Sequence, residues 1–364
     1  MSKTWMIYGT NGYTGELIAR EAAKRGCNVI LAGRSEEKVQ PLAKELGLAY
    51  QIFALDDLDV IVKNLQGKHL VLNCAGPFSC TAIAMQEACI KAGVHYLDIT
   101  GEATIFEHTL SPEQQERAKK AGIILCSGVG FDVIPTDCVA LRLKELLPDA
   151  THLDLGFDSE MALSPGTTKT VIEALGTGCL QRIDGVLQSR PLGLDHAYVD
   201  FGRGKKSAMA ISWGDVSTAY HTTGIPNIRT LIPMPLAFIY AARLSRFVEP
   251  LLANRSVQQM LKNLTERFVK GPDEVARLSL PTYVWGEARN ARGSTVTVRI
   301  RVANIYSMTV TGALYITEYI LNSSFELQGG SYTPAKLLSP HLITFLPDSS
   351  LFEIKCNQDY AKCG

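Results

Sequence analysis

The fold is decided by residues Trp5–Gly15, which read WMIYGTNGYTG. Four apolar residues, Trp5–Tyr8, predict a short strand, and a helical pattern over Thr14–Arg25 follows, with three glycines around the junction. Glycines spaced as GxxGxxG let a pyrophosphate approach the backbone, and the helix N-terminus offers it free N–H groups and a positive dipole end. The segment therefore predicts a dinucleotide site, with a plain glycine-rich turn as the alternative.

The first 130 residues alternate short apolar runs with helical patterns. Such alternation predicts βαβ units and a doubly wound parallel sheet, whose strands are apolar throughout because helices cover both faces. Pro41 lies inside the helix expected over Ser35–Gly47 and should kink or shorten it. The predicted strands are Trp5–Tyr8, Asn28–Ala32, Tyr50–Phe53, Leu70–Cys74, His95–Ile99 and Gly122–Ser127.

The pattern changes after Pro135, where a second domain of mixed α+β character is predicted. Val284–Ala288 and Thr295–Val302 are expected to pair as antiparallel strands around the turn region 289–293. The expected helices are Thr136–Leu146, 235–253, 256–269 and Thr311–Asn322. The other expected strands are Leu153–Phe157, Ala197–Phe201, Ser207–Ser212 and Thr218–Thr222.

The charge and cysteine content exclude several classes of protein. The 364 residues carry 36 basic and 36 acidic side chains, so the basic excess that a nucleic-acid binder uses to neutralise phosphates is missing. Nine cysteines without a CxxC pair predict reduced thiols in a cytoplasmic protein and no metal site. The longest apolar uncharged run, Leu231–Ala242, is shorter than the roughly 20 residues that span a bilayer.

The end of the second predicted strand distinguishes NAD from NADP. An NAD site usually has an acidic residue there for the ribose 2′-hydroxyl, whereas an NADP site favours an arginine that accommodates the 2′-phosphate. This sequence has Gly33, Arg34 and Ser35 at that point and no acid. A guanidinium can bind phosphate through two hydrogen bonds and Ser35 can add a third donor, so we predict NADP(H) as the cofactor. An ordinary solvated arginine is the alternative.

Ligands of a doubly wound sheet bind outside the carboxyl ends of its strands, so the residues after each strand are site candidates. The fourth predicted strand leads into Ala75, Gly76 and Pro77, where the glycine permits close passage of cofactor or substrate. The predicted cofactor-binding residues are Gly9, Thr10, Asn11, Gly12, Tyr13, Thr14, Gly15, Gly33, Arg34, Ser35, Ala75, Gly76 and Pro77.

Hydride transfer also needs a proton donor, and the fifth and sixth strand ends offer Tyr96, Asp98, Glu102 and Asp132. A carboxylate at a strand end often only binds loop N–H groups, and this structural role is the alternative for the three acids. His95 is a weaker candidate that could simply cap the fifth strand. No Tyr-x-x-x-Lys pair follows the fourth or fifth strand, so the catalytic dyad of short-chain dehydrogenases has no counterpart.

Five segments, in this order, resemble the saccharopine dehydrogenase-like oxidoreductases, and most closely their trans-acting enoyl reductase type. The segments are Gly9–Gly15, Ala32–Arg34, Asn73–Phe78, Tyr96–Glu102 and Gly130–Asp137. Later pieces extend the similarity over most of the chain. One of them, Ser164–Thr167, reads Ser-Pro-Gly-Thr where the family often has Ser-Gly-Gly-Thr, so this loop is expected to be reshaped.

The resemblance implies three parts. They are an NADP-binding Rossmann domain over 1–134, an inserted substrate and dimerisation domain over 135–305, and a C-terminal helical stretch over 306–364 that returns to the first domain. Members named for saccharopine act on an amino-acid imine, and members of the enoyl reductase type are associated with reducing acyl chains during lipid synthesis. Neither activity follows from the motifs alone.

The stretch Ile225–Ala242 is unusually apolar and could line a channel or touch a membrane surface, although a buried interdomain or dimer helix has the same composition. We therefore expect an NADP(H)-dependent reductase of an apolar or lipid-derived carbonyl or enoyl substrate. We expect it to be a homodimer with peripheral membrane or lipid contact. A non-catalytic NADP(H)-binding partner or sensor protein and a saccharopine-type imine reductase remain alternatives.

Overall fold

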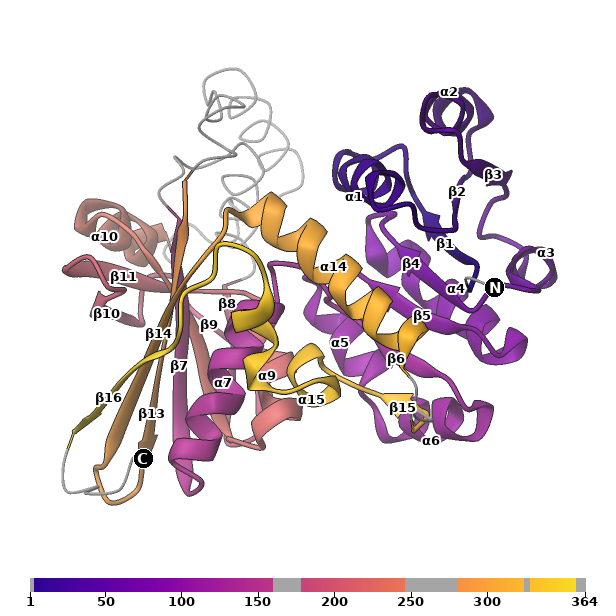
Figure 1. Ribbon diagram of the computed structural model, residues 1–364. Helices are drawn as coiled ribbons and strands as arrows, with labels where there is room; N and C mark the ends of the chain where they lie inside the picture. Colours follow the sequence, from indigo (N-terminus) through magenta and orange to yellow (C-terminus); the bar gives the residue numbers. More distant parts are fainter. Residues whose placement is uncertain (1–2, 160–177, 246–279, 324–327, 358–364) are drawn as a thin grey trace. The chain divides into compact units, whose positions relative to one another are not determined.

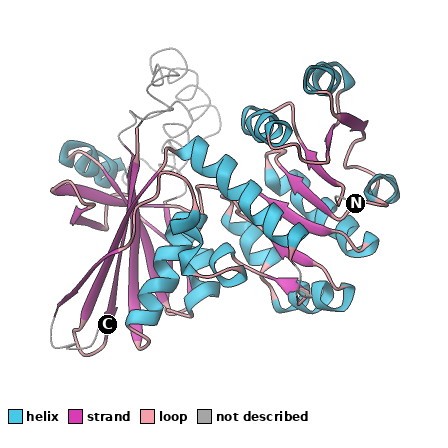
Figure 2. Cartoon of the chain, in the orientation of Figure 1, coloured by secondary structure: helices cyan, strands magenta, loops and turns pink. Residues whose placement is uncertain are grey.

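The computed structural model describes residues 3–159, 178–245, 280–323 and 328–357 (Figure 1). The chain forms two compact units. The first comprises Met1–Ile134 and Tyr306–Ser339, and the second comprises Pro135–Ile305 and Pro340–Gly364. Each unit is built around a sheet of its own, as the strands and helices of Figure 2 show.

The first unit contains a seven-stranded sheet in which every neighbouring pair of strands is parallel. Its order is β15-β6-β5-β4-β1-β2-β3, which confirms the predicted doubly wound architecture. The order reverses between β1 and β4, so the switch point lies beside the glycine loop that follows β1. The strands are β1 (Trp5–Tyr8), β2 (Val29–Gly33), β3 (Ala49–Ile52), β4 (Leu70–Asn73), β5 (His95–Asp98), β6 (Ile124–Cys126) and β15 (Gly330–Ser331).

Helices connect these strands, and their ends follow helix-capping chemistry. Ser111 accepts a hydrogen bond from the Gln114 N–H, and Pro112 opens that helix. The expected shortening of the second helix is wrong, because α2 continues through Pro41. Pro41 is exposed, so the carbonyl that lacks its helical partner can bind water. The helices are α1 (Tyr13–Lys24), α2 (Glu36–Leu46), α3 (Leu58–Leu65), α4 (Phe78–Ala92), α5 (Ala103–Thr109) and α6 (Pro112–Ala121).

The second unit contains a nine-stranded mixed sheet, which confirms its predicted α+β character. β12 and β7 are parallel, and the other pairs are antiparallel, including the predicted pair β13–β14. The strands are β7 (Ala150–Ser159), β8 (Cys179–Ile183), β9 (Val186–Arg190), β10 (His196–Asp200), β11 (Lys205–Ile211), β12 (Asn227–Pro233), β13 (Thr282–Asn290), β14 (Thr295–Val302) and β16 (Glu353–Asn357). The described α-helices of this unit are α7 (Ile134–Leu146), α9 (Asp215–Thr223) and α10 (Leu236–Ser245), and a 3-10 helix spans Pro340–Phe345.

The expected strand over Thr218–Thr222 is wrong, because this segment forms part of helix α9. Its β-branched residues favour a strand. In the structure, however, the hydroxyls of Thr218 and Thr223 donate to carbonyl oxygens four residues earlier, at 3.4 and 2.6 Å, which satisfies them inside a helix. Gly224 then ends the helix in the left-handed conformation, with φ of 69°.

The apolar run Leu231–Ala242 does not form one helix. It begins in β12, passes through Met234 and Pro235, and continues in α10. Among the described residues, no helix is long and apolar enough to cross a membrane. The helix expected over 256–269 and the motif Ser164–Thr167 lie outside the described residues.

The C-terminal stretch expected over 306–364 divides between the two units. Helix α14 (Ile305–Asn322) is followed by β15, which extends the first sheet by pairing with β6, and by α15 (Pro334–Leu337). β16 instead pairs with β14 and belongs to the second sheet. Only the part up to Ser339 therefore returns to the first unit.

Gly15→Ala should destabilise the first unit, because the new Cβ would lie 2.4 Å from the Gly9 carbonyl oxygen. We expect a loss of about 2–3 kcal/mol in the free energy of unfolding, measured in urea. Gly12→Ala is the matched control. Its Cβ would come no closer than 3.5 Å to any described residue, so we expect a loss below about 1 kcal/mol. Equal losses would contradict this account of the loop.

Candidate functional site

A pocket of about 560 Å³ opens in the first unit at the carboxyl ends of β1 to β4. It spans the switch point between β1 and β4, where ligands of doubly wound sheets bind, and its volume is typical of a cofactor site. The residues that line it are Tyr8, Gly9, Asn11, Gly12, Gly33, Arg34, Ala54, Leu55, Asp56, Cys74, Ala75, Gly76, Pro77, Cys80 and Thr81.

The glycine loop forms one wall of this pocket. Gly9 has φ of 89°, and an added Cβ there would lie 2.6 Å from the backbone nitrogen of Ala75, so the loops after β1 and β4 are in backbone contact. Gly12 is the N-cap of α1 and faces open space, since an added Cβ would meet nothing described within 3.5 Å. A glycine that leaves the start of a helix uncovered fits the pyrophosphate of a dinucleotide.

Arg34 follows β2, lines the pocket and is exposed. Its guanidinium forms no hydrogen bond or ion pair with the residues that the structure describes. An arginine that serves only as a surface charge commonly pairs with a neighbouring acid, as Arg20 does with Glu45 at 2.6 Å. A guanidinium without a protein partner, at the strand end that recognises the ribose, fits a 2′-phosphate.

Eight of the thirteen predicted cofactor-binding residues line the pocket, and five do not. Thr10 is buried and its hydroxyl donates to the Ala32 carbonyl at 3.4 Å, away from the pocket. Tyr13 packs edge-on against Tyr306, with ring centroids 5.1 Å apart. The predicted residues that line the pocket are Gly9, Asn11, Gly12, Gly33, Arg34, Ala75, Gly76 and Pro77. Those that do not are Thr10, Tyr13, Thr14, Gly15 and Ser35.

Asp98 is fully buried at the end of β5 and accepts four hydrogen bonds. Its Oδ1 accepts from the N–H groups of Thr100 and Gly128 at 3.0 and 2.9 Å, and its Oδ2 accepts from the hydroxyls of Tyr96 and Ser127, both at 2.8 Å. Burial raises the pKa of Asp98, and these donors oppose that rise only in part. The geometry favours the structural role, in which Asp98 joins the loops after β5 and β6.

Glu102 also has backbone partners. Its two carboxylate oxygens accept from the N–H groups of Phe78 and Ser79, at 2.7 and 2.9 Å. These N–H groups open α4, so the acid neutralises the positive end of that helix. Glu102 thereby fixes the loop that carries Gly76 and Pro77 into the pocket.

Asp132 follows β6 and differs from the other two acids. Its Oδ2 lies so near Gly101 that an added Cβ there would be 2.8 Å away. Burial raises the pKa of Asp132 to about 6, so it can hold and release a proton near neutral pH. None of the four predicted proton donors is among the described residues that line the pocket. His95 accepts from the Ile124 N–H at 3.0 Å, and burial lowers its pKa to about 4, which fits a structural role.

Residues 5–126 match the family model for the saccharopine dehydrogenase NADP binding domain. The matched span contains the glycine loop, Arg34 and every residue that lines the pocket. The match covers about a third of the chain. The match confirms the resemblance seen in the motifs, and it confirms NADP as the predicted cofactor of the domain.

Curated relatives match about half of this chain and carry several names. The saccharopine dehydrogenase-like oxidoreductase of Rattus norvegicus is 28% identical over 51% of this chain and 49% of its own length. The lipid droplet localized protein of Caenorhabditis elegans is 27% identical over 50% of this chain and 47% of its own length. The trans-acting enoyl reductase of Mycobacterium tuberculosis is 28% identical over 47% of this chain and 44% of its own length. The similarity thus spans about half of each relative.

Among solved structures, the apo saccharopine dehydrogenase (L-Glu forming) of Saccharomyces cerevisiae covers 98% of this chain and 100% of its own, with a TM-score of 0.63. The sequence identity is 12%, so this similarity concerns the fold alone. It confirms the predicted fold class, a Rossmann-type parallel sheet combined with a second, mixed-sheet unit.

Sequence reasoning missed part of the pocket of the NADP-binding domain. Ala54, Leu55 and Asp56 line it, and they follow β3 as Arg34 follows β2. The signal that would have found them is the carboxyl end of the third predicted strand. Asp56 lines the pocket, and a carboxylate is a group that can accept hydrogen bonds from hydroxyl or amino groups of a nucleotide.

Asp132→Asn should make the free energy of unfolding depend less on pH than it does in the wild type. Folding raises the pKa of Asp132 from 3.8 to about 6, so the folded protein holds this proton more tightly than the unfolded chain. The contribution to stability is complete below pH 3.8 and is lost as the pH rises through 6. Between pH 4 and 7, the free energy of unfolding of the wild type should therefore fall by about 2 kcal/mol relative to the variant, in urea titrations.

Asp59→Asn is the control for this comparison, because Asp59 is an exposed aspartate at the start of α3. Its difference from the wild type should be the same at both pH values. If the free energies of unfolding of Asp132→Asn and the wild type differed by the same amount at pH 4 and pH 7, the raised pKa of Asp132 would be contradicted.

Proposed function

We propose that this chain is an NADP(H)-dependent oxidoreductase that reduces an apolar or lipid-derived carbonyl or enoyl substrate. The observation that carries the proposal is the pocket of the NADP-binding domain, where an uncovered Gly12 and the free guanidinium of Arg34 lie at neighbouring strand ends. These two features suit the two phosphate sites of one NADP molecule.

The chain's own residues would supply binding, orientation and a proton, while the bound nicotinamide supplies the hydride chemistry. The loop around Gly12 would hold the pyrophosphate, and Arg34 would pair with the 2′-phosphate. Asp132 is the proposed proton donor, because its raised pKa of about 6 keeps it partly protonated near neutral pH. Asp98 and Glu102 would hold the surrounding loops in place.

An apolar substrate is supported by the second unit. Helix α10 exposes Leu236, Tyr240 and Leu244, whose exposed fractions are 37%, 54% and 64%. Large apolar side chains that gather on one exposed helix suit contact with acyl chains or a lipid surface. The names of the mycobacterial enoyl reductase and the nematode lipid droplet protein agree with this class of substrate. A homodimer in the cytoplasm with peripheral lipid contact completes the proposal.

A non-catalytic NADP(H)-binding partner or sensor protein is the second candidate. It is favoured by the carboxylates of Asp98 and Glu102, whose oxygens accept hydrogen bonds from their own loops, and by the complete burial of Tyr96. A saccharopine-type imine reductase is the third candidate. Substrate turnover separates these three functions.

Arg34→Ala should reduce the preference for NADPH over NADH by about 10- to 100-fold, because a charge-assisted phosphate contact is lost. The two affinities are measured by energy transfer from tryptophan to the nicotinamide. Lys38→Ala, which removes an exposed cation of α2 outside the pocket, is the matched control and should keep the preference. Gly12→Asp should abolish binding of both nucleotides. A wild type that binds NADPH and NADH equally well would contradict the role of Arg34.

Oxidation of NADPH with an enoyl thioester, a long-chain ketone and an amino-acid imine tests the reaction itself. We expect turnover with the first or second substrate and a loss of at least about 100-fold in kcat in Asp132→Asn, with NADPH affinity unchanged. Turnover of the imine alone would favour the saccharopine-type reductase. Tight NADPH binding without turnover of any substrate would favour the sensor protein.

A further inference from the structure

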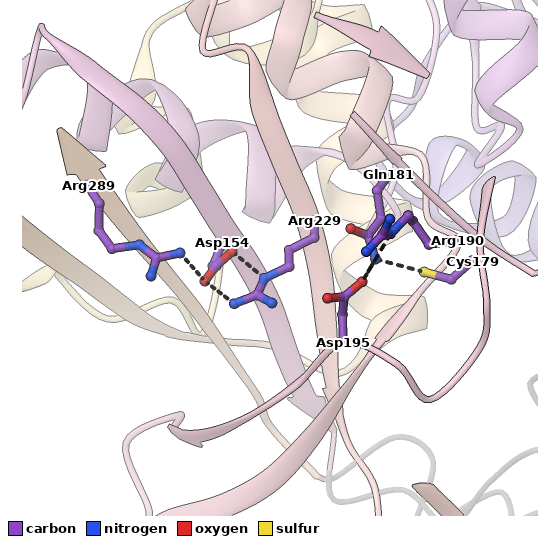
Figure 3. A network of polar contacts seen from close by, with 7 residues as sticks. All are labelled: Asp154, Cys179, Gln181, Arg190, Asp195, Arg229 and Arg289. Atoms are coloured by element: carbon purple, nitrogen blue, oxygen red, sulfur yellow. Dashed lines mark hydrogen bonds and ion pairs between the residues drawn. The ribbon is translucent and has the colours of Figure 1, made fainter. Parts of the chain in front are cut away.

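The second unit has a pocket of its own, of about 570 Å³, on the strands β7, β8, β9, β12, β13 and β14. It shares no residue with the NADP pocket. Its lining is dominated by charged and amide side chains, and Figure 3 shows the polar network that includes several of them. The lining residues are His152, Asp154, Gln181, Arg182, Ile183, Arg190, Asp195, Asn227, Ile228, Arg229, Arg289, Asn290, Gly293 and Thr295.

Two arginines from different strands share one carboxylate in this pocket. Asp154 of β7 is 6% exposed. Arg229 of β12 donates to both of its oxygens, through Nε at 2.7 Å and Nη2 at 2.9 Å. Arg289 of β13 donates to Asp154 Oδ2 through Nη2 at 3.2 Å, and Figure 3 shows the two guanidinium groups on either side of this carboxylate. Two positive charges thus face one negative charge.

Hydrogen-bond donors remain unused in the same place. The Nε of Arg289 is buried and has no partner among the described residues. The side chain of Arg289 is 40% exposed, so its guanidinium can be reached by a ligand while its buried Nε still lacks an acceptor. Arg190 of β9 approaches Asp195 only to 3.8 Å, which is beyond hydrogen-bond distance, so its donors are not saturated by this ion pair.

The charges that line the pocket are also unequal. Four arginines, at 182, 190, 229 and 289, face the two carboxylates of Asp154 and Asp195. Glu287 of β13 is in register with Asp154 and adds a third carboxylate beside the pocket, so the four arginines still outnumber the acids. The pocket therefore presents an excess of positive charge to a ligand.

We propose that this pocket binds the phosphate group of a phosphate monoester, with Arg190, Arg229 and Arg289 as donors. Arginine rather than lysine is the residue that binds phosphate through directed pairs of hydrogen bonds. Donors from three strands suit a tetrahedral group better than a planar carboxylate. The volume exceeds that of a bare ion and leaves room for the esterified part. The inference does not depend on the proposed NADP(H)-dependent activity.

Calorimetric titration with sn-glycerol 3-phosphate tests the site, and vesicles of phosphatidylcholine with or without phosphatidic acid test a lipid source of the same group. We expect binding of glycerol 3-phosphate, of the phosphatidic acid vesicles or of both. Binding of the soluble ester alone identifies a free metabolite, and binding of the vesicles alone identifies a lipid headgroup. Failure of the wild type to bind either probe would overturn the proposal, as would tighter binding of succinate.

Arg289→Gln and Arg190→Gln should each weaken the binding at least about tenfold, which corresponds to about 1.4 kcal/mol. Arg292→Gln is the matched control, because Arg292 is 71% exposed, pairs with Asp149 at 2.6 Å and does not line the pocket. Its effect should stay below about threefold. All three variants should keep the far-UV circular dichroism spectrum of the wild type, which shows that they are folded. An equal loss of affinity in Arg292→Gln would mean that the ligand responds only to the overall positive charge of this surface. That result would overturn the proposed site.

Discussion

The backbone contact between Gly9 and Ala75 is the constraint on which the cofactor pocket depends. An added Cβ on Gly9 would lie 2.6 Å from the Ala75 nitrogen, so the loops after β1 and β4 meet at the switch point with no side chain between them. Because Gly15 packs equally closely on Gly9, the loop turns at once into α1.

The two halves of the first sheet use their strand ends differently. On the side of β1 to β3, the strand ends leave an uncovered glycine loop and the unpaired cation of Arg34. On the side of β5 and β6, Asp98 and Glu102 accept six hydrogen bonds from their own surroundings. Asp98 and Glu102 therefore hold the loops around them in place. Asp132 is the acid whose raised pKa, about 6, suits proton transfer.

The sequence predicts the NADP pocket well because its signals are local. The glycine loop and Arg34 are recognised from their distance to a single predicted strand, and the loop at Asp56 would have followed from the same rule. The sequence predicts a strand where helix α9 forms, because threonines favour a strand unless their hydroxyls bond within a helix. The second pocket could not be predicted, since Asp154 is 75 residues from Arg229 and 135 from Arg289, and only the pairing of β7 with β12 and β13 brings them together.

The two pockets would recognise phosphate by different physical means. In the first, glycines leave the start of a helix uncovered and the guanidinium of Arg34 would add selectivity, so the backbone would do most of the binding. In the second, Asp154 holds Arg229 and Arg289 in place before any ligand arrives, which lowers the entropy lost on binding but also cancels part of their charge. A ligand must then be selected by the positions of the remaining donors rather than by total charge. Ligand binding should therefore depend on where the donors of an arginine lie, and not only on its charge. This distinguishes Arg289, which lines the pocket, from an equally charged arginine on the surface.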